Sequence, residues 1–429
     1  MTALVVGLML LSGPTAAQDT LRLPALQAAA VEHDPRARQM ALRAAAGELR
    51  LANLATGWLP ALMIAGSAAH QSEVPAIPLE VPGATIPVPP KDRYEAAVSV
   101  EQRLYDSGVL GRQREAERAR LKSELAQVSA TLYPLRAQVN EAFFQALSLQ
   151  AALRETATLM ADLEARLELV RAQAREGAAL PGDTAAVRAE LLRAGQSQSE
   201  AEAGRRAALA VLGELTGRPV AEMEVLAIPD LASEVAAIRH SREESVVAVH
   251  PQYAVFAAQR AALASESEVV QAEAGPRVAA FGEWAYGRPG LEQFTDRFHS
   301  YWMAGVRVHW QPWNWHATAR QREILEVQRE VIDTEAAAFG AGLRRQLLDE
   351  EATIDRLTEA LATDERIIEL RGQVERQARA QLAERVITPA AYISVRRDLQ
   401  DAQLARERHR VDLARSQAAY LTTLGAAPR

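Results

Sequence analysis

The chain has 429 residues, no cysteine and a formal net charge of −7. The lack of cysteine excludes disulfides, zinc–thiolate sites and thiol catalysis, and the even mixture of acidic and basic residues argues against nucleic acid as a partner. Aromatic residues make up only 5% of a composition dominated by alanine, leucine, arginine and glutamate, which is typical of long helices with narrow apolar seams.

The first residues resemble an export signal. An apolar run at 3–11 is followed by the small residues Thr15, Ala16 and Ala17. This order predicts a signal peptide at 1–17, although a buried N-terminal helix is the alternative. No later run approaches the roughly 20 apolar residues of a membrane-spanning helix, so association with a membrane would need another route.

The rest of the chain repeats itself at long range. Pro35 and Pro60 each recur 216 residues later, and the Arg-Gln-Arg-Glu sequence at 112–115 recurs 208 residues later. A repeat of this length indicates a duplicated half-protein and not a solenoid unit. We therefore expect two structural repeats, 18–230 and 231–429, each with a helix, a pair of strands and a long helical hairpin.

Alternating apolar and polar residues predict the strands. A period of two is typical of a strand with unlike faces. It predicts four strands, two in each repeat: 62–71 and 94–101 within 59–106, and 278–286 and 302–310 within 277–312. Four strands are too few to close a barrel and leave open edges, whereas three copies would supply twelve.

Aromatic side chains gather near the ends of the second strand pair. They are Trp284, Tyr286, Tyr301, Trp302 and Trp310. Such girdles mark the two interfaces of a membrane barrel, and aromatic packing in a soluble sheet is the alternative. The proline-rich segment at 74–90 cannot lie inside a strand and is expected to be an exposed loop.

A helical hairpin follows each strand pair, at 109–212 and at 317–424. Apolar residues recur every three or four positions from Leu121 to Ala174, which is the seven-residue period of a coiled coil. Pro134 interrupts this helix and should remove one backbone hydrogen bond. In the second hairpin, Thr388 precedes a proline, which predicts a helix start capped by the threonine hydroxyl.

Three motifs carry a family resemblance. They are Trp-Leu-Pro at 58–60, Gln-Arg-Leu-Tyr-Asp-Ser-Gly at 102–108, and Tyr-Leu-Thr-Thr-Leu-Gly at 420–425. With their order and duplication, the chain resembles the TolC family of bacterial outer-membrane efflux proteins, also called outer membrane factors. The resemblance implies a mainly α fold with a small β part. It also implies a homotrimer, in which twelve strands form one barrel in the outer-membrane lipid and the duplicated helical hairpins form an α-barrel tunnel through the periplasm of a Gram-negative bacterium.

The resemblance also assigns functional regions. The hairpin tips would contact a periplasmic adaptor (membrane fusion) protein, and the tip residues are Gly177, Leu180, Pro181, Val386, Thr388 and Pro389. Some family members narrow the tunnel entrance with aspartates after the second tip, but this chain has Arg396 in that region. The candidate entrance residues are Asp183, Glu190, Arg396 and Asp398, for which an ordinary solvated helix face is the competing explanation.

The function implied by the resemblance is a passive exit duct in a tripartite efflux or type I secretion system. The adaptor would open the duct, and an inner-membrane pump would drive transport. A soluble periplasmic coiled-coil scaffold or adaptor is the alternative, supported by the helical seam alone. The histidines lack metal-ligand spacing, no nucleotide-binding loop occurs, and a helix-start role explains His33 and His250, so we expect neither a cofactor nor an enzyme.

Overall fold

The computed structural model describes residues 21–75, 88–177, 180–240, 250–292, 296–384 and 386–426, with the side chains of Pro389 and Ala390 excepted. The expected signal peptide and most of the proline-rich segment lie outside these residues. The described chain forms two compact units, the helical unit (within Met1–Arg38, Val128–Tyr253 and Ala338–Arg429) and the sheet unit (within Gln39–Gln127 and Ala254–Ala337). Both expected repeats contribute to both units. The boundary between the repeats, at residue 230, stays a prediction.

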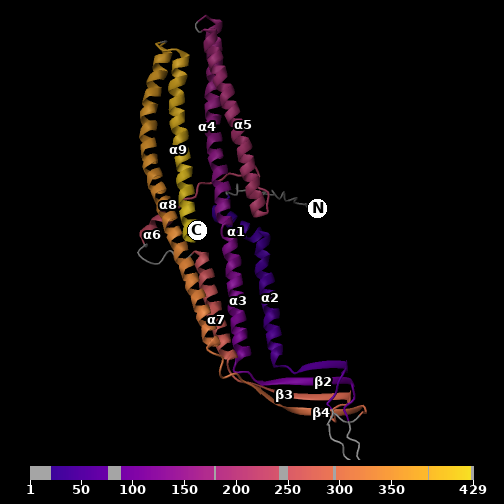
Figure 1. The fold of residues 1–429 in the computed structure, drawn as a ribbon. Coiled ribbons are helices and arrows are strands. Elements are labelled where there is room, and N and C mark those ends of the chain that lie inside the picture. The colour runs from indigo at the N-terminus through magenta and orange to yellow at the C-terminus, as the bar shows by residue number, and fades with distance from the viewer. Residues whose placement is uncertain are drawn as a thin grey trace, which may run out of the picture. The chain divides into compact units, whose positions relative to one another are not determined.

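Two long helical hairpins dominate the helical unit (Figure 1). The first pairs α4 (Leu135–Arg175) with α5 (Pro181–Thr216), and the second pairs the end of α8 (Ala317–Ala383) with α9 (Pro389–Leu424). Helix α9 also packs against α4. These hairpins are the ones expected from the periodicity, and α9 begins at the predicted residue.

The proline in the first long helix acts as expected. Helix α3 (Val109–Leu132) ends before a turn at Tyr133 and Pro134, and α4 begins at Leu135. Proline has no N–H to donate to the preceding turn, so the ladder of backbone hydrogen bonds is broken at this point.

The core of the helical unit lies where short elements cover the long helices. These elements are α1 (Leu23–His33), which the 3-10 turn η1 (Pro35–Ala37) follows, and α6 (Ala232–His240). Tyr420 and Phe143 are fully buried in the cluster against which α1 packs. The buried Gln150 side chain bonds both backbone groups of Leu226, at 2.9 and 3.1 Å, and so satisfies a loop that would otherwise bury unpaired polar groups.

His250 lies in the helical unit and starts α7 (Pro251–Glu273), and its role is the expected one. Its Nδ1 accepts a hydrogen bond from the backbone N–H of Gln252 at 3.1 Å. In the first repeat the equivalent acceptor is Asp34, which takes the N–H of Arg36 at 2.8 Å, and not His33. The His250 ring also packs against Tyr133 and Phe339, and this burial lowers the pKa of His250.

This cap predicts a loss of stability in mild acid. Only neutral imidazole can accept at Nδ1, and the folded-state pKa of His250 is lowered below 6.5. Its stabilising contribution is therefore complete above about pH 6.5 and is lost as the pH falls through the folded-state value. The lost cap contributes about 1 kcal/mol. Among the described ring contacts of His250, the only other titratable side chain is Tyr133, and burial raises the pKa of Tyr133, so its phenol keeps its proton in this range.

The measurement is the melting temperature between pH 8 and pH 5 for the wild type and for His250→Asn. An asparagine oxygen can cap the helix but does not titrate. We expect the wild type to lose more melting temperature than the variant on acidification. Parallel curves would contradict the assignment.

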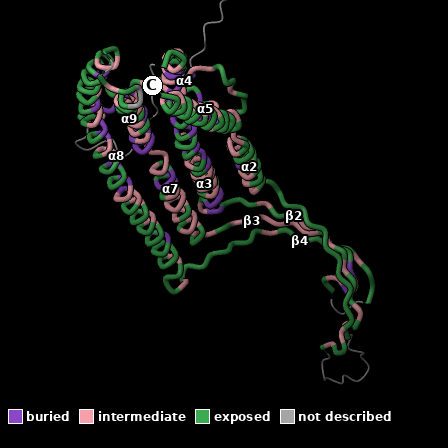
Figure 2. The backbone as a smooth tube through the Cα atoms, turned by 90° about the horizontal axis from the view of Figure 1, so that it is seen from above, coloured by how far each residue is buried: buried purple, intermediate pink, exposed green. Residues whose placement is uncertain are grey.

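The sheet unit contains one antiparallel sheet in the order β1-β2-β3-β4. The strands are β1 (Ala61–His70), β2 (Asp92–Tyr105), β3 (Arg277–Arg288) and β4 (His299–His309). All four expected strands are confirmed. Figure 2 shows most of their length as exposed or half-buried, and among the described residues β1 and β4 each have one edge without a strand partner.

The helices of the sheet unit meet through polar contacts more than through a core. Arg50 on α2 (Arg38–Ala55) bonds Glu117 and, at 3.1 Å, Glu124, both on α3. Gly47 lets α2 approach α3 closely, because a Cβ here would lie 2.6 Å from Leu121. Along the described helices, none combines the length and the hydropathy needed to cross a membrane.

Candidate functional site

The sheet has one apolar face. Because directly paired residues share a face, the register places nearly all even-numbered strand residues together. The charged members of this face, Asp92 and Arg288, lie at strand ends. Its members between those ends include Leu62, Ile64, Gly66, Ala68, Tyr94, Ala96, Val98, Val100, Val278, Ala280, Gly282, Trp284, Tyr286, Trp302, Ala304, Val306 and Val308. Trp302 is 74% exposed and Val306 is 62% exposed, so this face lacks a covering layer within the described chain.

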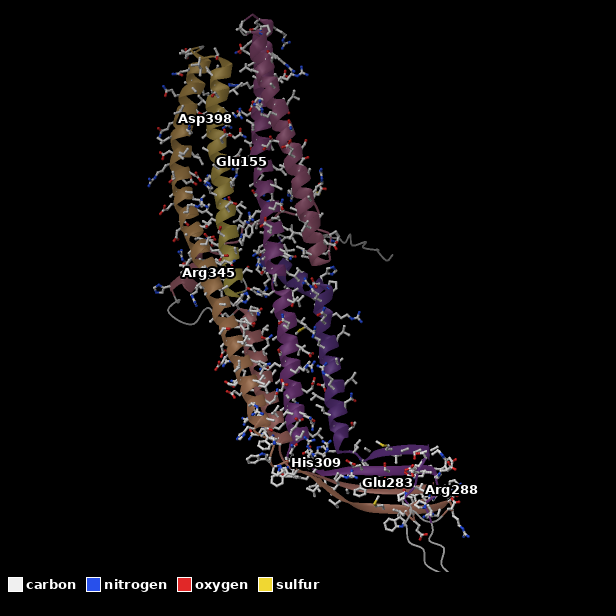
Figure 3. The ribbon with its side chains drawn as sticks, viewed as in Figure 1. Glu155, Glu283, Arg288, His309, Arg345 and Asp398 are labelled. Atoms are coloured by element: carbon white, nitrogen blue, oxygen red, sulfur yellow. The ribbon has the colours of Figure 1, made fainter. Side chains whose placement is uncertain are left out.

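The opposite face is polar. Arg307 bonds Glu101 at 3.1 Å and stacks over the Phe281 ring at 4.7 Å. Tyr301 donates to Glu95 at 3.0 Å, so the structure places this predicted girdle residue on the polar face, away from the other four. Figure 3 shows Glu283 within β3, with Arg288 and His309 toward opposite ends of the sheet.

Aromatic residues flank the apolar face at both ends. Phe298 stacks on Tyr94 and Tyr286 at one end, and Trp310 follows β4 at the other, 58% exposed. Tyr286 pairs with Ser300 of β4, and Ser300 lies ten residues before Trp310 in the chain. At about 3.4 Å per residue and a tilt of about 40°, this distance spans about 26 Å of height, close to the ~25 Å apolar band of a membrane barrel.

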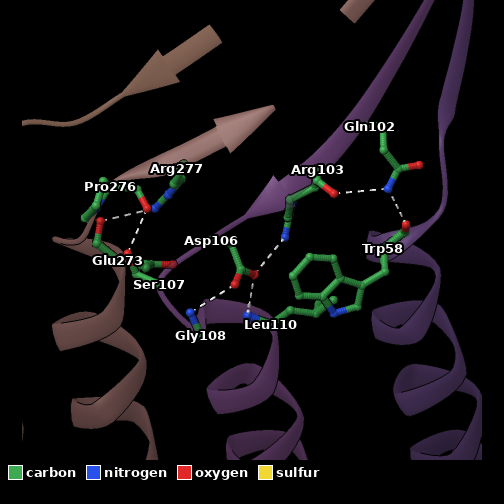
Figure 4. Close-up of polar contacts among 10 residues, drawn as sticks. All are labelled: Trp58, Gln102, Arg103, Asp106, Ser107, Gly108, Leu110, Glu273, Pro276 and Arg277. Atoms are coloured by element: carbon green, nitrogen blue, oxygen red, sulfur yellow. Dashed lines mark hydrogen bonds and ion pairs between the residues drawn. The ribbon is translucent and has the colours of Figure 1, made fainter. Parts of the chain in front are cut away.

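The Gln-x-Leu-Tyr-Asp-x-Gly motif joins the sheet to the long helix (Figure 4). The buried Asp106 accepts the backbone N–H of Gly108 and of Leu110, each at 3.0 Å, and thereby caps α3. Ser107 donates to the Pro276 carbonyl at 2.7 Å, and Gln102 donates to the Trp58 carbonyl at 2.7 Å. The motif therefore links three places at which the chain passes between a helix and the sheet. The sequence motif marked this region, but the contacts of Asp106 and Ser107 could not be derived from it.

The hairpin tips expose apolar side chains. Leu180 is 72% exposed before Pro181, and Val386 is 69% exposed in the second tip. The first tip turns at Gly177, whose φ of +71° suits glycine. Thr388 caps α9 as predicted, because its hydroxyl accepts the Ala391 N–H at 3.2 Å, before the backbone of Pro389 begins the helix.

The candidate entrance residues all have partners within the chain. Asp183 accepts the Leu180 N–H at 3.1 Å and so stabilises the start of α5. Glu190 pairs with Arg193 at 2.6 Å. Asp398, on α9 in Figure 3, pairs with Arg371 of α8 at 2.7 Å.

Ion pairs and one cation–π contact tie the two hairpins together near the beginning of α9. Arg396 bonds Asp162 of α4 at 3.1 Å, and Arg397 lies 3.8 Å from Glu190 of α5. The Arg166 guanidinium stacks on the Tyr392 ring at 4.0 Å. These contacts are termed the hairpin ties below. Sequence reasoning identified Arg396 but not Asp162, Arg166 or Tyr392, because partners on another helix have no spacing signature.

Tyr392 anchors the hairpin ties. Its hydroxyl donates to Glu375 at 2.6 Å, and Glu375 also pairs with Arg379 at 3.1 Å. Burial raises the pKa of Tyr392, so the phenol keeps its proton and remains a donor. Within the described part of the chain, no group of three metal-ligating side chains comes together.

Comparisons with known proteins agree on the fold. Residues 22–218 match the family model described as outer membrane efflux protein. No curated protein sequence matches the chain. Among solved structures, the outer membrane protein VceC from Vibrio cholerae is 13% identical, with 94% of this chain and 96% of that chain covered and a TM-score of 0.67.

Two further structures extend this likeness. CusC, studied for folding and transmembrane channel formation, is 13% identical over 95% of this chain and 93% of its own, with a TM-score of 0.69. The outer membrane channel MtrE of Neisseria gonorrhoeae, in its open state, is 16% identical over 95% and 89%, with a TM-score of 0.65. The likeness therefore covers nearly the whole chain and both hairpins.

Proposed function

We propose that the chain belongs to the outer membrane efflux protein family, whose model matches residues 22–218, and that three copies form a passive exit duct across the outer membrane. Members of this family lie in the outer membrane of Gram-negative bacteria and extend into the periplasm. The segregation of apolar and polar residues onto opposite faces of the sheet carries the proposal. Lipid covers the even-numbered face, and the polar face lines an aqueous lumen.

The unpaired edges of the sheet unit support a homotrimer. Strands β1 and β4 each need a partner, and four strands cannot close a barrel, whereas twelve can. The helices next in sequence to these edge strands expose apolar residues one or two turns apart: Leu42 and Leu49 on α2, and Ile324, Val327 and Val331 on α8. One copy would thus present α2 and β1 to the α8 and β4 of its neighbour.

The hairpins form the periplasmic tunnel of the proposed duct. A periplasmic adaptor contacts the tips, and an inner-membrane pump supplies the energy, so the chain itself catalyses no reaction. The hairpin ties hold the closed state, because adaptor docking must separate the two hairpins of each copy to widen the entrance. The main test is purification from outer membranes, where a trimer that conducts ions in a planar bilayer is expected. A monomer in the soluble periplasmic fraction would overturn the proposal.

The apolar tips predict the adaptor contact. Replacing Leu180 and Val386 with aspartate removes two exposed side chains, each contributing about 1.5 kcal/mol or more when buried by a partner. We expect at least a tenfold loss of affinity for the proposed periplasmic adaptor, measured by biolayer interferometry on the purified trimer.

Leu192→Asp is the matched control for the tip variant. Leu192 is a 67% exposed leucine on α5, and its loss should leave the adaptor affinity unchanged. Equal losses in the control and the tip variant would show that the tips are not the docking site.

A further inference from the structure

Two equivalent turns lead from the sheet into the long helices. Residues 106–108 and 314–316 are 208 positions apart, the spacing of the internal repeat. The carbonyl of Asp106 accepts the Val109 N–H at 3.1 Å, and the carbonyl of Asn314 accepts the Ala317 N–H at 3.0 Å. The two turns therefore have the same backbone path.

The second turn adopts this path with unsuitable residues. Ser107 and Gly108 have φ values of +55° and +82°, and Trp315 and His316 have +54° and +61°. The left-handed region strains a bulky side chain, and glycine relieves that strain. A serine and a glycine already satisfy this turn in the first repeat. The tryptophan and histidine are thus held at a cost that the turn itself does not require.

The strained turn exposes a cluster of tryptophans. Trp315 is 74% exposed and Trp313 is 64% exposed, with their rings 5.7 Å apart. Trp310 is 58% exposed and continues the alternation of the apolar sheet face. The cluster therefore extends the face assigned to lipid, at the helix end of the sheet.

A cavity of about 490 Å³ lies among these rings. Arg322 lines it and is held by a hydrogen bond from Nε to Ser267 at 3.1 Å. No carboxylate is among the described residues that line the cavity, so its charge suits an anion. Tryptophan beside arginine is the combination that membrane interfaces favour, because the ring is amphipathic and the guanidinium binds phosphate.

We propose that the tryptophan turn, residues 310–316 with Arg322, is an anchor for the glycerophospholipids of the periplasmic leaflet. The rings lie at the boundary between headgroups and acyl chains, and Arg322 contacts the headgroup phosphate. This inference rests on the proposed function for the orientation of the sheet unit. It adds a lipid class and a site that the function does not require.

The test uses the full-length protein in nanodiscs of phosphatidylethanolamine and phosphatidylglycerol. Trp58, Trp284 and Trp302 are replaced by phenylalanine, so that emission reports Trp310, Trp313 and Trp315. Half of the lipid carries bromine near the headgroup end of its acyl chains. The key variant, Trp315→Ser with His316→Gly, copies the first repeat, and Trp315→Phe keeps an aromatic ring.

We expect the serine–glycine variant to lose at least half of the quenching by brominated lipid, while its melting temperature stays equal or rises. Trp315→Phe should retain the quenching of the remaining two tryptophans. Arg322→Gln should lower the number of phosphatidylglycerol molecules retained by the trimer in native mass spectrometry, and inorganic phosphate should leave the emission unchanged.

Unchanged quenching in the serine–glycine variant would overturn the anchor. A fall in its melting temperature would also do so, because the turn would then be structural. Unchanged lipid retention in Arg322→Gln would overturn the phosphate contact, as would a response to inorganic phosphate alone. Failure of the proposed function is distinguishable, because the parent protein would then form no trimer in the discs.

Discussion

Val306→Arg is expected to abolish assembly in the outer membrane. Val306 lies on the apolar face near the middle of β4, about halfway between the two aromatic ends. An arginine facing lipid at the midplane costs about 2–4 kcal/mol, so a trimer would lose about 6–12 kcal/mol. This loss is comparable to the whole stability of an ordinary domain. We expect at least a tenfold fall in heat-resistant trimer, measured by unheated gel electrophoresis of outer-membrane fractions.

Met303→Arg provides the matched control. Met303 is on the same strand but on the polar face, and it lies directly opposite Glu283. An arginine there gains an opposite charge across the strands and faces water in the proposed lumen. The trimer yield should stay near that of the wild type. Similar yields for the two arginine variants would contradict the assignment of the faces.

Removing the two ion pairs among the hairpin ties should open the duct without its adaptor. Arg396→Ala with Arg397→Ala breaks the contacts to Asp162 and Glu190. Each partly exposed pair contributes up to about 1 kcal/mol, so the six pairs in a trimer contribute up to about 6 kcal/mol. A change of about 5.5 kcal/mol is enough to invert a 99:1 equilibrium. We expect the mean conductance in planar bilayers to rise at least tenfold.

Arg371→Ala is the control for the hairpin ties. The pair of Arg371 with Asp398 joins α8 to α9 within one hairpin, at 2.7 Å, and does not connect the two hairpins. Its removal should leave the conductance unchanged. Equal conductance in the double variant and the wild type would show that these ties do not hold the entrance closed.

The sequence predicted the elements that repeat a simple period. The hairpins follow from apolar residues at every third or fourth position, and the strands follow from the alternation of apolar and polar residues. Each pattern arises because one side of the element is apolar and the other side faces water. Alternation also predicts which residues share a face within a strand. Tyr301 is adjacent to Trp302 in sequence, but consecutive strand residues point to opposite faces, and the register accordingly separates Tyr301 from the other girdle residues.

Contacts between distant helices could not be predicted in the same way. Asp162 and Arg396 are 234 residues apart, and nothing in either local pattern specifies the other. The same holds for Ser107 and Pro276, although the motif around Ser107 carries part of the family resemblance. The cap at His250 could be predicted only in part. The proline after His250 indicated a helix start, but nothing in the sequence indicated that Asp34, and not His33, accepts the equivalent hydrogen bond in the first repeat.

The polar face of the sheet has a consequence for ion selectivity. Glu101 and Arg307 form a pair, and Glu95 and Glu283 share the same surface with Arg93 and Arg103. In the proposed trimer each of these charges recurs three times around the lumen, and both signs occur at similar heights. A permeant cation and a permeant anion would therefore meet nearly compensated potentials. The wall would sort solutes by size more than by sign, which leaves the choice of cargo to the pump.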